Sequence, residues 1–455
     1  MKQVLICLVL CLSITGCATN SLFVNYPSQI QSQKQALNSS QPESQLSQLT
    51  ENISGNDGLL YAQEAGRVAQ IAGNFAQSKK YYQQAINKYL TFDNKAEISA
   101  SDLGANASSL LLNDNAIPYE GPGFERIMLH QYQAFNYLFE HDFQGALVEV
   151  RRANELQQIQ QDKYEESKKS VQRIANGTVA SQVEQLRQGT GSVTSSFLNA
   201  YSYYVTGLLH EILGNANDAF IDYRKAAAIW PQNPFVEQDL VRLAKQLSMP
   251  QYSDFRRKFG EVKLPKRNQG ELIVIYEKGF VQPKGHFSVP FTVHGNWQTI
   301  DLPTYNHAAT YPGAATISGL PSSLHAASIT SIDALAMNSL RENLPLILAR
   351  QVARVYAKAE LARKLTGKHH RKNDPFDLGS LAVQIFNVVS EQADRRSWLT
   401  LPNQAQIGRK YVNAGTYPIS IENSQTQNIT IQAGRKTLVW IVNTGNYVRF
   451  YTILI

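Results

Sequence analysis

The stretch GLLHEILGNANDAFIDYRKAAAIWP, which runs from Gly207 to Pro231, predicts the fold of the first half of the chain. Its side chains follow the order small, turn, small, small, large, small at Gly207, Gly214, Ala216, Ala219, Tyr223 and Ala226. Small residues let two helices approach closely, and a large residue fills the space beside them. We therefore expect two helices that are joined near Gly214 and that end before Pro231.

Two earlier segments align with this stretch without a gap. The first carries Gly66, Gly73, Phe75, Ser78, Tyr82 and Ala85. The second carries Ala134, His141, Phe143, Ala146, Val150 and Ala153. These offsets resemble those of the tetratricopeptide repeat, a helix hairpin of about 34 residues. Buried helix contacts are then expected at Ala85, Ala153, Ala219 and Ala226.

Partner binding follows from this resemblance. Stacked helix hairpins form extended binding surfaces, and in the repeat the first helix of each hairpin lines the inner face. The resemblance thus implies a partner groove with the candidate residues Gln63, Arg67, Gln70, Gln131, Tyr203 and His210. Unrelated helix hairpins are the alternative, and extra residues between the units leave open whether they form one continuous groove.

The N-terminus carries a second resemblance. Lys2 precedes an apolar run from Val4 to Ile14, and small residues then lead to Gly16 and Cys17. This order resembles the lipobox of bacterial lipoprotein precursors, which implies cleavage after Gly16, thioether lipidation of Cys17 and acylation of the new amino terminus. An ordinary secretory signal and a transmembrane anchor are the alternatives, but the run is shorter than the ~20 residues that span a bilayer.

Location and partners follow from the same segment. In a two-membrane bacterium, Ala18 after the lipidated cysteine implies transport to the outer membrane, facing the periplasm. Cleavage removes Cys7 and Cys11 of the chain's 3 cysteines, so the mature protein has no intramolecular disulfide and no cysteine metal site. The formal charge of +7 favours anionic lipid or acidic polymers as partners. Nucleic acid is not expected outside the cytoplasm.

The chain of 455 residues divides into segments of different pattern. We expect a signal peptide over 1–16, a tether with one or two weak helices over 17–56, a helical domain over 57–255 and an α+β domain over 256–455. Strands are predicted at both ends of this last domain, over 272–276, 287–293, 411–421, 428–432, 437–442 and 447–455. A helical pair is inserted at about 328–398, and its second helix is expected over 374–388. The predicted fold is therefore an all-α tetratricopeptide-like domain followed by a β-sheet or small sandwich with an inserted helical pair.

The whole chain resembles a family of uncharacterised proteobacterial outer-membrane lipoproteins with tetratricopeptide-like repeats. The resemblance is carried by Tyr119–Arg126, Gly270–Gly279 and Ala393–Trp398 with Leu401 and Pro402. Members are sometimes encoded beside lipoproteins that activate penicillin-binding proteins. The resemblance therefore implies a role in cell-envelope or cell-wall maintenance.

Catalytic motifs are lacking in the sequence. It has no Gly-x-Ser-x-Gly, His-Glu-x-x-His, Walker or Rossmann pattern. Its histidines show no metal-ligand spacing at His286, His294, His307, His325, His369 and His370. We predict no catalytic residue, metal or cofactor. Glu277 and Asp394 could form the pair of acids that glycoside hydrolysis requires, but an ion pair of Glu277 with Arg395 or Arg396 is the simpler interpretation.

The sequence thus favours a non-catalytic protein-interaction adaptor that is anchored by lipid and binds an envelope protein. The first alternative is a binder of an envelope polymer or anionic lipid through the C-terminal domain. Its candidate residues are Glu277, Asp394, Arg395, Arg396 and Trp398, together with Trp297 and the basic run Lys364–Lys372. Trp440 has apolar neighbours and is expected in the core. An envelope hydrolase is the second alternative.

Overall fold

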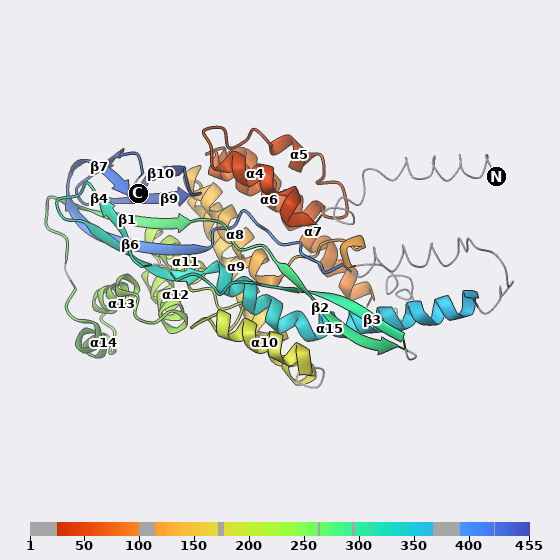
Figure 1. The fold of residues 1–455 in the computed structure, drawn as a ribbon. Coiled ribbons are helices and arrows are strands. Elements are labelled where there is room, and N and C mark those ends of the chain that lie inside the picture. Colours follow the sequence, from red (N-terminus) through yellow and green to blue (C-terminus); the bar gives the residue numbers. More distant parts are fainter. Residues whose placement is uncertain are drawn as a thin grey trace.

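The computed structural model describes residues 25–99, 114–171, 177–262, 264–293, 296–311, 313–366, 392–422 and 424–455. Helices occupy the N-terminal part, and a mixed sheet that curls into a near-barrel occupies the C-terminal part (Figure 1). The coarse prediction of a helical region followed by a region of strands with an inserted helix is confirmed. Cys17, the predicted helix over 374–388 and most of the Lys364–Lys372 run lie outside the described residues.

The helical part contains three hairpins at the predicted places. Its helices are α3 (Tyr26–Gln29), α4 (Gln31–Leu37), α5 (Leu46–Thr50), α6 (Gly58–Ile71), α7 (Phe75–Ser99), η2 (Asp114–Ala116), α8 (Gly123–Phe139), α9 (Phe143–Val171), α10 (Gly177–Gly189), α11 (Ala200–Ile212), α12 (Ala216–Ile229), α13 (Pro234–Gln246) and α14 (Tyr252–Phe259). The hairpins are α6–α7, α8–α9 and α11–α12. Their connections contain Gly73, His141 and Gly214, which all have positive φ angles, of 84°, 63° and 80°. Glycine adopts this conformation at little cost, whereas histidine does so less readily.

The predicted close approach of the paired helices is confirmed. A Cβ atom added at Gly66 would lie 2.2 Å from the Tyr82 ring, and one added at Gly207 would lie 2.7 Å from the Tyr223 ring. Because these glycines have no side chain, the tyrosine rings can occupy the space beside them. All four predicted contact alanines are fully buried, namely Ala85, Ala153, Ala219 and Ala226.

The N-terminal segment differs from the expected tether. Within its described part, Tyr26, Ile30, Leu37 and Leu49 are buried in the same core as α6. Arg449 near the C-terminus donates a hydrogen bond of 2.8 Å to the Leu37 carbonyl. The apolar residues are sparse but recur on one face of short helices, so they can pack against the helical body. The tether prediction is wrong for these residues.

The sheet is built from both ends of the C-terminal part, as predicted. Its strands are β1 (Gln269–Lys278), β4 (Ala315–Ser318), β5 (Leu324–Ser331), β6 (Gln404–Asn413), β7 (Gly415–Ile421), β8 (Gln427–Ile431), β9 (Lys436–Asn443) and β10 (Val448–Leu454). Their order is β10-β9-β1-β6-β5-β4-β7-β8. The pair β1–β9 is parallel, and the other pairs are antiparallel. The Thr437 hydroxyl donates to the Thr430 carbonyl at 3.3 Å, which brings β8 beside β9 and curls the sheet.

Strand β1 connects the two parts of the molecule. Leu272, Val274 and Tyr276 face the core enclosed by the curled sheet. Ile273 and Ile275 face the opposite way and belong to the core shared with the helices. A strand that is covered on both faces needs a continuous apolar run, and β1 has one.

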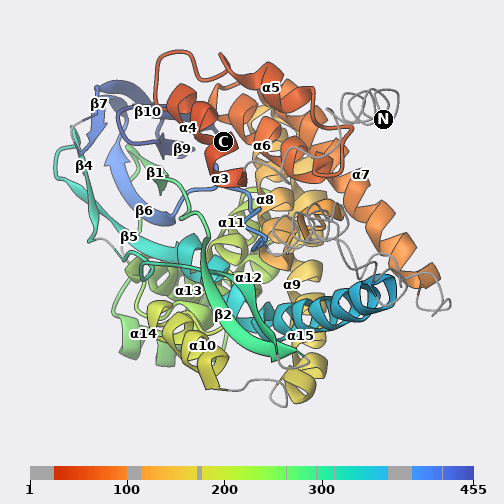
Figure 2. The ribbon, with the colours of Figure 1, turned by 45° about the vertical axis from the view of Figure 1, so that its right-hand side comes forward.

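An arm extends from the body beside a long helix. It is the two-stranded pair β2 (Gly285–Val293) and β3 (Asn296–Thr304), and its strand β3 contacts α15 (Ile332–Thr366), which lies near the pair in both views (Figures 1 and 2). Phe287 and Val289 pack against the shared core, whereas Ser288 and Pro290 are exposed. This alternation confirms the predicted half-buried strand.

Candidate functional site

A single buried carboxylate collects one hydrogen bond from each of the three hairpins. Glu277 of β1 accepts from Arg67 of α6, with 2.5 Å between Nη2 and Oε2. It also accepts from the hydroxyl of Tyr132 of α8 at 3.0 Å and from that of Tyr201 of α11 at 2.7 Å. Helices α6, α8 and α11 are the first helices of their hairpins. The inner face that was predicted to hold a partner therefore holds β1 of the same chain.

The positive charge of Arg67 balances the negative charge of Glu277 in this network. The Arg67 guanidinium lies 4.1 Å from the centre of the Tyr132 ring and 5.4 Å from that of Trp440, in addition to its ion pair with Glu277. Burial lowers the pKa of Arg67, but Tyr132 and Glu277 outweigh this effect, so its pKa is raised. Burial raises the pKa of Tyr132 and Tyr201 well above the usual range. The site thus contains a fixed positive charge, a carboxylate and two neutral phenols.

All six predicted groove residues are buried. At most 8% of the surface of any one is exposed, for Gln63, Arg67, Gln70, Gln131, Tyr203 and His210. Gln70 donates to the Asn136 side chain and to the Tyr132 carbonyl, each at 2.7 Å. The expectation of an exposed groove at these positions is therefore wrong. The sheet covers Arg67, whereas Gln63 and His210 lie against other helices, beside Tyr89 of α7 and Asp222 of α12.

A second polar cluster joins the third hairpin to the sheet. Arg409 of β6 contacts Glu211, Asp239 and Glu271 at distances between 2.7 and 3.2 Å. Burial raises the pKa of Glu211 and Glu271, but the cations Arg409, Lys436 and Arg242 together outweigh it, so the pKa of each carboxyl is lowered. Sequence patterns did not indicate this cluster, because its members come from α11, α13, β1 and β6.

The candidate residues of the C-terminal segment divide between two places. Arg396 forms ion pairs with Asp394 at 2.8 Å and with Asp57 at 2.5 Å. The predicted ion pair of Glu277 with Arg395 or Arg396 is replaced by the pair with Arg67. Trp398 is fully buried, and its ring contacts that of Tyr132, which also binds Glu277. Trp440 is fully buried, as expected.

Two further carboxylates hold this segment through its backbone. Glu64 of α6 accepts from the Leu399 N–H at 2.7 Å, and Glu125 of α8 accepts from the Trp398 N–H at 2.9 Å. Burial raises the pKa of both to about 7, although hydrogen bonds from Thr400 and from the Trp398 N–H respectively oppose the rise. Sequence reasoning missed both residues. Each is an acid within the first seven residues of its helix, and no local pattern marks it as a site residue.

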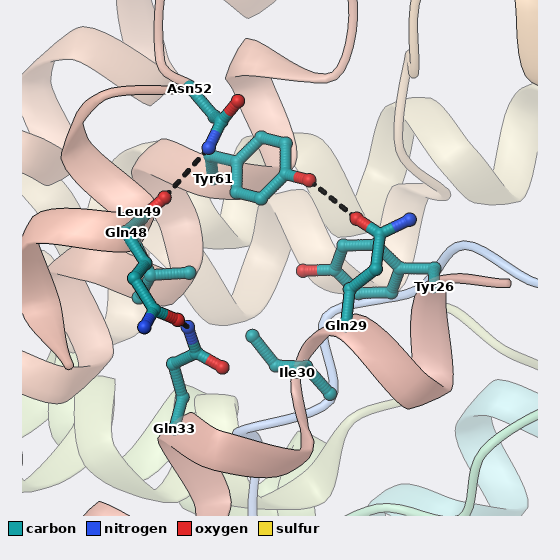
Figure 3. Close-up of a pocket in the computed structure, with 8 residues that line it drawn as sticks. All are labelled: Tyr26, Gln29, Ile30, Gln33, Gln48, Leu49, Asn52 and Tyr61. Carbon is teal, nitrogen blue, oxygen red and sulfur yellow. Dashed lines mark hydrogen bonds between the residues drawn. The ribbon is translucent and has the colours of Figure 1, made fainter. Parts of the chain in front are cut away.

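A surface pocket lies where the N-terminal helices meet α6. It has a volume of about 280 Å³ and is lined by Tyr26, Gln29, Ile30, Gln33, Gln48, Leu49, Asn52 and Tyr61 (Figure 3). The Tyr61 hydroxyl donates to Gln29 at 2.7 Å, and the Gln33 amide donates to Gln48 at 3.2 Å. The sequence shows that this segment is rich in amide side chains. We predicted a tether here, and a tether has no packed core that could form a pocket.

Another cavity, also of about 280 Å³, has Tyr26 in its lining as well. Its lining includes Arg395, His286 and Asp301. The Arg395 guanidinium donates to the Lys284 carbonyl at 2.6 Å, and the His286 ring lies 3.9 Å from Asp301. This is the place of Arg395, away from the ion pairs of Arg396.

Metal ligands do not gather in the part of the chain that the structure describes. No group of three or more histidine, cysteine, aspartate or glutamate side chains there is placed to hold a metal ion. His294, His369 and His370 lie outside that part. None of the helices within the described ranges is long and apolar enough to cross a membrane. The chain matches no protein-family model and no curated protein.

Proposed function

We propose that this chain is a lipid-anchored, periplasm-facing envelope protein that acts as a non-catalytic interaction adaptor, with an envelope protein bound on the arm of β2, β3 and α15. Trp297 is the observation that carries the proposal. Its side chain is 75% exposed, more than any other large apolar side chain of the described residues. An indole held in water on a projecting element is typical of a binding surface, where tryptophan contributes strongly to affinity.

The buried carboxylate network supports a structural role for the inner face. Glu277 has three donors and no exposed surface. A general acid or nucleophile must reach its substrate, so Glu277 does not favour the alternative of glycoside hydrolysis. Because β1 occupies the inner face of the hairpins, a partner protein needs another surface, and the arm supplies one.

The three hairpins favour the tetratricopeptide-like interpretation. The aligned positions Gly73, His141 and Gly214 all lie in turns with positive φ, and Gly66 and Gly207 both leave space for an aligned tyrosine. We infer that the units are repeats of this kind whose inner face has become an internal interface. Their role in the adaptor is to hold the sheet and the arm in one orientation.

A photo-cross-linking amino acid at position 297 tests the arm in intact cells. We expect it to capture a defined envelope protein, because the indole position is in the contact. The matched control is position 264, where Leu264 is 59% exposed in the segment between α14 and β1. Capture of the same proteins from both positions, or of none from position 297, contradicts the proposal.

Replacement of the lipidated residue tests the anchor separately. Several acyl chains bind a membrane stably, at ~0.8 kcal/mol per buried methylene. Cys17→Ser should therefore release the protein into the soluble periplasmic fraction, which cell fractionation measures. A variant that stays in the membrane pellet after a high-salt wash shows that another anchor exists.

A further inference from the structure

We infer that the pocket between the N-terminal helices and α6 binds one ring of a neutral, N-acetylated saccharide. The inference goes beyond the adaptor proposal, because the pocket is built by α3, α4, α5 and α6 and is separate from the arm. Figure 3 shows four amide side chains and two tyrosines directed toward one space. No residue predicted from the sequence as a binding residue lines it.

The chemistry of the lining selects for hydroxyl and acetamido groups. Four primary amides contribute to the wall, from Gln29, Gln33, Gln48 and Asn52. Each amide offers two donor hydrogens and one acceptor oxygen. Sugar hydroxyls and an acetamido group need both kinds of partner in close succession. This wall therefore matches a ligand whose polar groups both donate and accept hydrogen bonds.

Charge is the second selective feature. The eight lining residues are all uncharged at neutral pH. A carboxylate or ammonium group that enters such a site loses hydration and gains no opposite charge. The pocket thus disfavours charged peptides, phosphates and deacetylated amino sugars. A neutral ring remains as the best match.

The floor of the pocket suits the apolar face of a sugar ring. Ile30 and Leu49 contribute aliphatic surface, and Tyr26 and Tyr61 contribute aromatic rings whose centres lie 6.1 Å apart. Tyrosine combines an apolar ring with a polar hydroxyl, which suits a ligand with one apolar and one hydroxylated side. A volume of about 280 Å³ limits the occupant to a small ligand or to one unit of a polymer.

The pocket is organised before a ligand arrives. Tyr26, Gln33 and Leu49 are each at most 3% exposed, which fixes the floor. Arg449 and the Asn446 N–H bind Leu37 and Asn38 at the end of α4, and so attach this helix to the end of the sheet. Gln33 donates to the Gln48 side chain, and Asn52 donates to the Gln48 carbonyl. These amide groups turn about broad terminal torsions, so they can exchange such bonds for bonds to a sugar at low cost.

Calorimetry on the full-length chain with Cys17→Ser tests the inference. The probe is the β-1,4-linked tetramer of N-acetylglucosamine, and the comparison is the deacetylated tetramer, which carries ammonium groups. We expect the acetylated tetramer to bind about tenfold more tightly or better. Gln48→Ala with Asn52→Ala should weaken that binding about tenfold or more. The matched control Gln84→Ala, at an exposed position of α7, should leave it unchanged.

Three results overturn the inference: no heat with the acetylated tetramer, equal or tighter binding of the deacetylated one, or unchanged affinity in the double variant. Tyr61→Phe covers the case in which the double variant unfolds, because it removes one hydroxyl that contacts Gln29 and keeps the ring. It should weaken binding as well. The assay needs neither the anchor nor an arm partner, so its outcome is independent of the adaptor proposal.

Discussion

The buried carboxylates of Glu277, Glu64 and Glu125 all join the helices to the C-terminal part, but the groups that bind them differ. Glu277 lies against the Arg67 guanidinium. Glu64 and Glu125 have no surface exposed either, but no cation of the described residues pairs with them: they accept from the backbone N–H groups of Leu399 and Trp398 and from the hydroxyls of Tyr26 and Tyr119. Burial raises the pKa of Glu64 and Glu125 to about 7. A buried acid that is held by N–H and O–H dipoles, without an ion pair, therefore takes up a proton near neutral pH.

The largest effect is expected from removal of the charge opposite Arg67. Glu277→Ala leaves the guanidinium buried without its carboxylate, which costs about 3–5 kcal/mol of the free energy of unfolding. Urea denaturation measures the loss. The combined change Arg67→Met with Glu277→Leu should cost less than Glu277→Ala, because no buried charge remains unpaired. A double variant that is no more stable than Glu277→Ala shows that the charges do not set the cost.

The second prediction concerns pH. The pKa of Glu64 and Glu125 is about 7 in the folded state and about 4.3 when unfolded. Between these values the unfolded state has already lost the protons that the folded state still holds. The free energy of unfolding should therefore fall as pH rises from about 5 to about 7, by up to ~1.4 kcal/mol per pH unit for each group.

Replacement of Glu64 and Glu125 by glutamine shows how much of the pH dependence comes from these two carboxyls. Glu64→Gln with Glu125→Gln removes both protons from the equilibrium, so the pH dependence should become much flatter. A smaller slope remains from Asp222 and Asp333, because burial raises the pKa of each to about 6. Urea denaturation at several pH values provides the measurement, and an unchanged slope in the double variant contradicts the assignment.

An apolar change should lower stability without a pH dependence. Ala219 is fully buried at the contact of α11 and α12. Ala219→Leu overpacks this contact and should cost ~1–3 kcal/mol, equally at pH 5 and pH 8. Thermal unfolding at both values measures it. A variant as stable as the parent shows that the helix register at this contact is wrong.

The smallest effect is expected at a surface ion pair. Hydrogen bonds from Arg187 lower the pKa of Glu184 to about 2, yet water surrounds both side chains and screens the pair. Glu184→Gln should leave the free energy of unfolding unchanged within error. If it destabilises the protein as much as Glu277→Ala does, burial is not the reason that the Arg67–Glu277 pair matters more than the Arg187–Glu184 pair.

The sequence predicted those features that depend on neighbouring residues. The offsets from Gly66 to Ala85 and from Gly207 to Ala226 indicated paired helices with a turn between them, and the structure has both. The apolar run Leu272–Tyr276 indicated a buried strand, which is β1. Helix contacts, turns and strand burial repeat over a few residues, so they can be recognised without knowing the rest of the fold.

The tertiary structure alone decided what the inner face of the helices binds. Arg67 and Glu277 are separated by 210 positions in the chain, and either could equally have faced a partner protein or solvent. The apolar positions of Tyr26 and Leu49 likewise allowed a tether or a packed segment. Pairing between distant residues depends on which surfaces lose most water when the whole chain packs. This choice is a property of the assembled core, and no local pattern encodes it.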